Sequence, residues 1–345
     1  LLCGSALAVC GLMLQTAFKN PLAGPSAMSI PVGLDDDLSA MLLNNDVDPE
    51  VPEGTEYYLP AGSSYRVTPF ALMKGFRLAG SRDGVKPIVV LEGSWSIAEG
   101  SYLSSLEFDN IEFRHEANNN YFMNTSKAYT IENVSFVNCD FISLRRGFWR
   151  HQSANAKYIM NLEMEGCRFE GCGWQTSAYG AFNLQSFDKD NGVSYDQVDR
   201  AIFRNCTFSN DNDGTNGYGW GNLFYAPYMD KPIDLEYKNV TIYNYSRNQR
   251  LINIESAVGS KLVMEGILLA SPCGDLFAIG ANTTTTFSNN YTTADYTLGG
   301  KNMNATDLKI TAAELFADPA NGDLTIKDTS SPIVSNRAGD TRWLP

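Results

Sequence analysis

The chain has 345 residues, of which 43% are hydrophobic and 12% aromatic, a composition that can form an extended globular core. Its 39 acidic side chains outnumber the 26 basic ones, the net charge is −13, and no run of basic residues exceeds two. Nucleic acid and anionic membrane surfaces are therefore not expected as its main partners.

Residues 1–17 are apolar and rich in Gly and Ala, and they are too few to span a membrane. They resemble the apolar part of a secretion signal whose basic start is missing. Leu1-Leu2-Cys3 also fits the end of a lipoprotein cleavage box, which would make Cys3 the lipidated residue. An ordinary apolar cap helix is the alternative. We expect export to the outer membrane, the cell surface or the periplasm, with residues 18–54 forming an N-terminal cap.

An eight-residue pattern, apolar-x-apolar-x-(Asn/Gly)-apolar-x-apolar, recurs through the middle of the chain. Weaker copies occupy 76–80 and 285–292, and the strongest copies occupy 106–113, 134–141, 162–169, 201–208, 235–242 and 262–269. Each copy alternates with period two on both sides of an Asn or Gly, so it predicts two short strands joined at a left-handed bend. Successive Asn/Gly positions lie 23 to 39 residues apart. This spacing indicates stacked coils of a parallel β-helix, because most units are too short for a propeller blade.

A third strand follows each pattern after a loop of variable length. These segments are 121–126, 148–153, 181–186, 223–228, 251–256 and 276–281. Three strands per coil resemble the right-handed, pectate-lyase-like parallel β-helix superfamily, which implies an all-β domain of about eight coils over residues 55–300. The closing stretch, 323–345 within a C-terminal cap of 301–345, is similar to the end of uncharacterised β-helix domains in Bacteroidetes surface lipoproteins of polysaccharide-utilisation systems. That resemblance implies outer-membrane glycan-uptake partners.

Strand alternation assigns side chains to the inside or the outside of the coils. Cys139, Cys167 and Cys206 share one pattern position and should stack inside as unpaired thiols, since seven cysteines without a CxxC pair do not suggest a disulfide framework or a zinc site. In the third strands two columns should point inward: Phe122, Trp149, Phe182, Phe224, Ile252 and Phe277, then Asn124, His151, Leu184, Ala226, Ile254 and Ile279.

The residues between these columns should point outward. The first outward row is Met123, Arg150, Asn183, Tyr225, Asn253 and Ala278, and the second is Thr125, Gln152, Gln185, Pro227, Glu255 and Gly280. In the middle coils this face is rich in planar donors and acceptors, which a polar polymer such as a glycan requires. A solvated sheet face is the alternative, although such faces more often carry Lys, Glu and Thr.

The loops before these strands carry aromatic and basic side chains and should border the same face. They are Trp174, Tyr179, Tyr218, Trp220 and Tyr245, with Arg145, Arg146 and Arg247. Aromatic faces stack on sugar rings and Arg pairs with carboxylates. Together with Arg150, Gln152, Asn183, Gln185, Tyr225, Asn253 and Glu255, these loops predict a polysaccharide site, including for glycans that contain uronic acids.

Catalytic signals are weak. The face lacks the aspartate cluster and Gly-His-Gly of polygalacturonase-like hydrolases, and Glu255 would need a partner such as Asp213 or Asp230 to act as a glycosidase pair. We expect a monomeric binding protein without a cofactor. The only indication of calcium is the segment NDNDG at 210–214. It resembles part of a calcium-binding loop but lacks the spaced acidic ligand that completes one. A polysaccharide lyase, with Arg150, Lys157 or Tyr225 as base, is the alternative, and a structural or adhesin-like β-helix is a further one.

Overall fold

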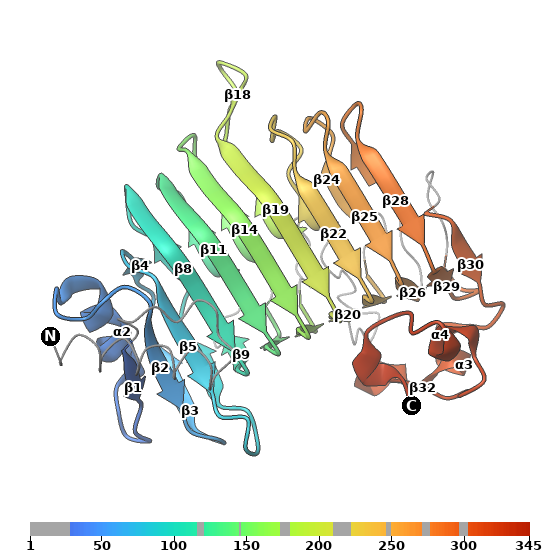
Figure 1. Cartoon of the computed structure of the whole chain (residues 1–345), viewed down its shortest axis with the longest axis horizontal. Coiled ribbons are helices and arrows are strands. Elements are labelled where there is room, and N and C mark those ends of the chain that lie inside the picture. Colours follow the sequence, from blue (N-terminus) through green and yellow to red (C-terminus); the bar gives the residue numbers. More distant parts are fainter. Residues whose placement is uncertain are drawn as a thin grey trace, which may run out of the picture.

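The structure, a computed structural model, describes residues 28–115, 121–144, 146–172, 180–209, 222–245, 250–270, 277–296 and 303–345. It consists almost entirely of parallel strands stacked into three long sheets, as Figure 1 shows. The first sheet contains, in spatial order, β1 (Ser29–Pro31), β2 (Thr55–Leu59), β5 (Phe76–Gly80), β8 (Ser101–Asp109), β11 (Tyr129–Val137), β14 (Lys157–Glu165), β19 (Asp196–Arg204), β22 (Asp234–Lys238), β25 (Lys261–Glu265) and β28 (Thr284–Ser288).

The second and third sheets receive the chain in turn after each strand of the first. The second sheet contains β3 (Ser64–Val67), β6 (Ile88–Leu91), β9 (Glu112–His115), β12 (Asp140–Ile142), β15 (Arg168–Glu170), β20 (Thr207–Ser209), β23 (Thr241–Tyr243), β26 (Leu268–Ala270), β29 (Asn290–Thr292) and β30 (Ala305–Asp307). The third sheet contains β10 (Tyr121–Thr125), β13 (Gly147–His151), β16 (Gly180–Leu184), β21 (Asn222–Tyr225), β24 (Ile252–Ile254) and β27 (Phe277–Ile279). The pair β4 (Ala71–Leu72) and β7 (Ser96–Ile97) extends this third sheet through a bridge between Trp95 and Met123.

Eight complete coils result, from β2–β3–β4 to β25–β26–β27, and the predicted right-handed parallel β-helix is confirmed. The longest step of the repeat, between Gly166 and Asn205, has a local cause. A hairpin of β17 (Phe187–Asp188) and β18 (Val193–Ser194) is inserted between β16 and β19, and it projects from the coils in Figure 1.

The Asn/Gly bends are left-handed, as the pattern predicts. The backbone φ angle is positive at Asn110, Asn138, Gly166, Asn205, Asn239, Gly266 and Asn289. Neighbouring bends are also linked, because the Asn138 amide nitrogen donates to Asn110 Oδ1 at 2.7 Å. The recurring residue therefore serves two purposes, a backbone conformation that few residues tolerate and a hydrogen bond between coils.

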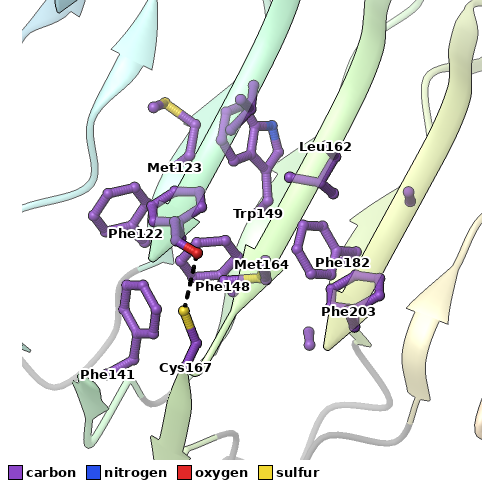
Figure 2. Packing of buried hydrophobic residues seen from close by; sticks show 14 of the residues in the cluster. Phe122, Met123, Phe141, Phe148, Trp149, Leu162, Met164, Cys167, Phe182 and Phe203 are labelled. Carbon is purple, nitrogen blue, oxygen red and sulfur yellow. Dashed lines mark hydrogen bonds between the residues drawn. The ribbon is translucent and has the colours of Figure 1, made fainter. Parts of the chain in front are cut away.

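Aromatic side chains stack from coil to coil along the core. Phe113, Phe141, Phe169 and Phe208 form one column with ring centroids 4.7–5.4 Å apart, which follows the spacing of the strands. Cys139, Cys167 and Cys206 are fully buried and unpaired, which confirms that prediction. Figure 2 shows Cys167 among the core aromatics, where its thiol donates to the carbonyl of Phe136.

The N-terminal end of the helix is covered by α2 (Leu38–Val47), which buries Leu38 and Leu42. At the other end α3 (Ala312–Leu315), β31 (Phe316–Asp318), a 3-10 turn at Pro319–Asn321, β32 (Asp323–Ile326) and α4 (Pro332–Ser335) pack on the outer face of the second sheet, against Leu268 and Tyr291 (Figure 1).

The chain then runs back across the coils as a terminal strap, residues 336–343, which ends in a 3-10 turn at Thr341–Trp343. Its contacts move to an earlier coil with almost every residue. The Asn336 carbonyl accepts a hydrogen bond from the Asn289 side chain, and the Gly339 amide donates to the Gly266 carbonyl. Asp340 then bonds Thr241 and Thr207, and Thr341 bonds Asn205. Arg342 donates to the Gly166 carbonyl and pairs with Asp140.

Candidate functional site

The third sheet presents one outward row of side chains, which we call the outer row. Register pairing aligns Asn124, Arg150, Asn183, Tyr225, Asn253 and Ala278 on six successive strands. The flanking residues Phe182 and Leu184 are buried in the core, so Asn183 between them lies on the opposite face of its strand. Four of the predicted site residues, Arg150, Asn183, Tyr225 and Asn253, are therefore brought together in one line.

The sequence alignment of the first of these strands was wrong by one residue. Met123, and not Phe122, pairs with Trp149, and Met123 and Thr125 are buried instead of pointing outward. Asn124, predicted to point inward, takes the outward position beside Arg150. The slip arises because Tyr121, Phe122 and Met123 form a run of three buried residues, whereas the next strand has Gly147 before its buried pair, Phe148 and Trp149.

The residues of the outer row differ in exposure. Arg150 and Tyr225 are half-buried, whereas Asn183 is only 1% exposed and Asn253 5%. The amide of Asn253 is engaged, since its Oδ1 accepts a hydrogen bond from the backbone N–H of Glu255 at 3.3 Å. The buried amide of Asn183, in contrast, has no hydrogen-bond partner on either Oδ1 or Nδ2 among the described residues.

Two glycines at the start of the strands make room for the aromatic members of this face. Gly147 is aligned with Tyr121 on the preceding strand, and Gly180 with Asn222 on the following one. A Cβ at Gly147 would lie 3.1 Å from the Tyr121 ring, and a Cβ at Gly180 would lie 2.9 Å from the Tyr225 Cβ. The Arg150 guanidinium lies over the Tyr121 ring, 5.4 Å from its centroid. This cation–π contact orients Arg150 along the row.

The second predicted row is less regular. Gln152 and Gln185 are half-buried and follow the ends of their strands, and Pro227 is buried. Glu255 is exposed and pairs with Arg250, whose nitrogen lies 3.2 Å from Glu255 Oε2. This basic residue was missed by the sequence analysis, which proposed Arg247. Burial, and then the nearby hydroxyl of Tyr228 and carboxylate of Glu255, raise the pKa of Tyr225, so its phenol stays protonated at neutral pH.

An aromatic stack just beyond the C-terminal ends of β16 and β21 was also missed. Phe187, in the inserted hairpin, stacks on Tyr228 from the next coil with centroids 4.3 Å apart and an interplanar angle of 15°. Tyr228 is 36% exposed. The stack depends on a hairpin that the repeat pattern does not contain, and the only sequence signal was the long step between Gly166 and Asn205.

Most of the predicted loop residues cannot be placed. Trp174, Tyr179, Tyr218, Trp220, Arg145 and Arg247, and the NDNDG segment at 210–214 with Asp213, lie outside the described residues. Arg146 is described and half-buried. The expectation for Tyr245 was wrong, because this side chain is 2% exposed and its ring packs in the core, 6.1 Å from the ring of Phe208.

A buried polar network lies directly beneath the outer row. His151 is fully buried, and its Nδ1 lies 2.6 Å from Asp196 Oδ1 while its Nε2 lies 2.5 Å from the Tyr129 hydroxyl. Trp149 Nε1 donates to the same Tyr129 oxygen at 3.3 Å. The inward position predicted for Trp149 and His151 is therefore confirmed. Burial lowers the pKa of His151, so the imidazole is neutral and hydrogen-bonded on both nitrogens.

Lys157 belongs to the same interior and not to the outer face. It is 1% exposed, and its ammonium donates to the carbonyls of Ser153 and Asn155 and to the hydroxyl of Ser186. Burial lowers its pKa to about 8. Although that value would suit a base, the amine points away from the row, so Lys157 is not positioned to take a proton from a ligand there.

Comparison with known proteins identifies one family match. The model of the FecCD transport family matches residues 1–33, which is 33 of 345 residues and ends before the first complete coil begins at Thr55. The match includes the 1–17 segment interpreted above as a secretion signal, and it does not assign the β-helix to a family. No curated protein matches the chain.

The described residues contain neither a membrane-spanning helix nor a metal-binding cluster. None of the helices in the described ranges is both long enough and apolar enough to cross a membrane. No cluster of His, Cys, Asp and Glu in that part of the chain has the geometry to hold a metal ion.

Proposed function

We propose that this β-helix binds a polysaccharide along the outer row and acts in glycan capture outside the cytoplasm. The observation that carries the proposal is the alignment of Asn124, Arg150, Asn183, Tyr225 and Asn253 on five successive coils. Strands in a sheet are ~4.8 Å apart, so these planar polar groups repeat at that interval along the helix axis. A stretched polysaccharide presents hydroxyl groups at a comparable repeat.

The charge of the row favours an acidic glycan. Arg150 is held by Tyr121 and lies in the row itself, whereas the exposed carboxylate at its border, Glu255, is already paired with Arg250. The carboxylate of a uronic acid could therefore pair with the Arg150 guanidinium without repulsion from an unpaired Glu255. The proposed uptake context rests on the similarity of 323–345 to polysaccharide-utilisation lipoproteins.

Binding is favoured over lyase chemistry by the state of the candidate bases. The pKa of Tyr225 is raised, which disfavours the phenolate, and Lys157 is buried on the inner side of its strand. The third candidate, Arg150, is held over the Tyr121 ring. An ultraviolet assay for unsaturated products, run on polygalacturonate and alginate, tests this choice: product formation that disappears in Arg150→Ala would establish the lyase instead.

Affinity electrophoresis through gels containing polygalacturonate, alginate or a neutral β-glucan tests the binding. Arg150→Ala should reduce the retardation by the acidic polymers, by roughly tenfold in apparent affinity for a lost charge-assisted contact, and should affect the neutral polymer less. Arg200→Ala is the matched control, because Arg200 is 44% exposed on the first sheet and pairs with Glu163. Wild-type protein that no polymer retards would contradict the proposal and leave the structural or adhesin-like alternative.

The proposed location requires its own test because residues 1–33 have two interpretations, a secretion signal and a segment of the transport family that they match. Fractionation of cells that express the chain with and without these residues distinguishes them. Appearance in the periplasm or on the surface only when 1–33 are present supports export.

A further inference from the structure

Asn183 occupies the centre of the outer row, between Arg150 and Tyr225 on the adjacent strands. Its side chain is 1% exposed, and neither amide atom has a hydrogen-bond partner among the described residues. Two other buried asparagines provide a contrast. In Asn110 and Asn290, both amide atoms are bonded, with Asn290 Oδ1 accepting from the Ile267 amide and its Nδ2 donating to the Met264 and Met303 carbonyls.

An amide buried without partners destabilises the fold that contains it, since it has lost its bonds to water and gained none. A leucine of similar volume would avoid that penalty at Asn183. Asn183 lies on the face where a ligand is proposed, and among the described residues it is the one buried side chain with two unpaired polar atoms. An unpaired buried polar group in a native fold requires an explanation, and on this face a ligand that bonds the amide supplies one.

The geometry of the amide defines what could satisfy it. It offers one acceptor and one donor side by side in a plane, so the matching group must offer a donor and an acceptor side by side. A pair of neighbouring hydroxyl groups on a sugar ring meets this requirement. The neighbours of Asn183 in the row, Arg150 and Tyr225, are both half-buried, and Tyr225 lies close to Gly180.

We infer that Asn183 is the specificity-determining residue of the outer row and that it takes a vicinal hydroxyl pair of one sugar unit once the side chains that cover it move aside. This inference rests on the proposed function, because it assigns a role within the same row. It adds that binding depends on free hydroxyl groups of the polymer and not only on its charge. A site that recognises hydroxyl groups through a buried amide discriminates strongly against ligands that lack them.

The experiment compares stability and binding in the same variants. Asn183→Leu should raise the thermal unfolding midpoint by about 2 °C or more, because the unpaired amide is removed, and should weaken binding to polygalacturonate at least tenfold. Asn183→Ala provides a second variant, with binding lost in the same way, if leucine does not fit. Asn133→Leu is the matched control: its amide bonds the Ser104 carbonyl and Asn161 on the first sheet, so its midpoint should fall and its binding should not change.

Chemical modification of the polymer supplies the second arm. Polygalacturonate O-acetylated at its hydroxyl groups keeps its carboxylates but loses the hydroxyl donors, so the wild-type protein should bind it at least tenfold more weakly than the unmodified polymer. Asn183→Leu should no longer distinguish the two polymers, whereas Arg150→Ala should still do so.

Three outcomes would overturn the inference. A lower unfolding midpoint for Asn183→Leu would show that the amide is bonded within the protein. Unchanged binding by that variant, with Arg150→Ala weakened, would remove the role of Asn183 and leave the proposed function intact. Failure of the wild-type protein to bind any of the polymers would remove both.

Discussion

Replacement of Asn110 by leucine should separate the two contributions of the bend residue to stability. Asn110 is 4% exposed and has a φ angle of 56°. Its Nδ2 donates to the Ser81 carbonyl at 2.5 Å, and its Oδ1 accepts from Asn138 at 2.7 Å. A branched residue in the left-handed region costs roughly 1–2 kcal/mol. Two lost hydrogen bonds cost about 1 kcal/mol each, so we expect a total of about 3–4 kcal/mol.

Asn110→Gly is the matched control because glycine adopts the left-handed conformation freely but cannot make either hydrogen bond. Its expected cost is about 2 kcal/mol, which is the hydrogen-bond contribution alone. Urea unfolding followed by circular dichroism and by tryptophan fluorescence gives both values, with comparison of the slopes to check that the same transition is measured. If glycine destabilises as much as leucine, the backbone argument is wrong. If neither variant differs from wild type by more than a few tenths of a kcal/mol, the bend is not specified by its asparagine.

Two other predictions concern the buried network and the glycines of the third sheet. His151, which faces Tyr129, Trp149 and Asp196, has a pKa lowered by burial, so below about pH 6.5 the unfolded chain binds a proton that the folded protein resists. The free energy of unfolding should therefore fall as the pH is lowered through that value. The urea midpoint of His151→Gln should fall less between pH 7 and 5 than that of the wild-type protein. Identical pH profiles of the two proteins would contradict this prediction. Gly180→Ala should weaken glycan binding in affinity electrophoresis, because its Cβ would lie 2.8 Å from the Phe182 carbonyl oxygen and would displace Tyr225. Unchanged binding would show that the position of Tyr225 is not important.

The fold was predictable because the bend in each repeat requires a residue that tolerates a left-handed backbone, either Asn or Gly. The Asn/Gly bend fixes the phase of the pattern, and strands on each side then bury every second residue, as Phe108 and Phe136 do with rings stacked 4.8 Å apart. Since each coil pairs with its neighbours in register, a prediction for one coil applies to all of them.

The candidate site was predictable where the start of the strand was unambiguous. The strands that were aligned correctly have two consecutive buried residues before the outward one, as Phe148 and Trp149 precede Arg150. The first strand was misaligned because Tyr121, Phe122 and Met123 form a run of three buried residues, which leaves the alignment ambiguous by one position. Alternation reports the side of a strand on which a residue lies, but the hydrophobic pattern cannot show how many inward residues precede it.

Contacts that depend on insertions were beyond the sequence argument. Among the described residues, the stack of Phe187 on Tyr228 requires a hairpin found in one coil, and the pair of Arg250 with Glu255 joins two residues that flank β24. Asn183 is buried by the residues around it, although its position in the strand is an outward one. No periodicity in the sequence reports such effects.

The terminal strap changes how this solenoid should respond to force and heat. In a stack of repeats each unit normally contacts only its neighbours, so the ends can fray one coil at a time. Here residues 336–343 join the coil of Asp140 to that of Asn289, through coils that are not adjacent in the stack. A coil in the C-terminal half cannot open without breaking contacts that also hold a distant coil. The strap thus makes several nearest-neighbour units behave as one cooperative unit, while the coils before Asp140 retain the freedom to open separately.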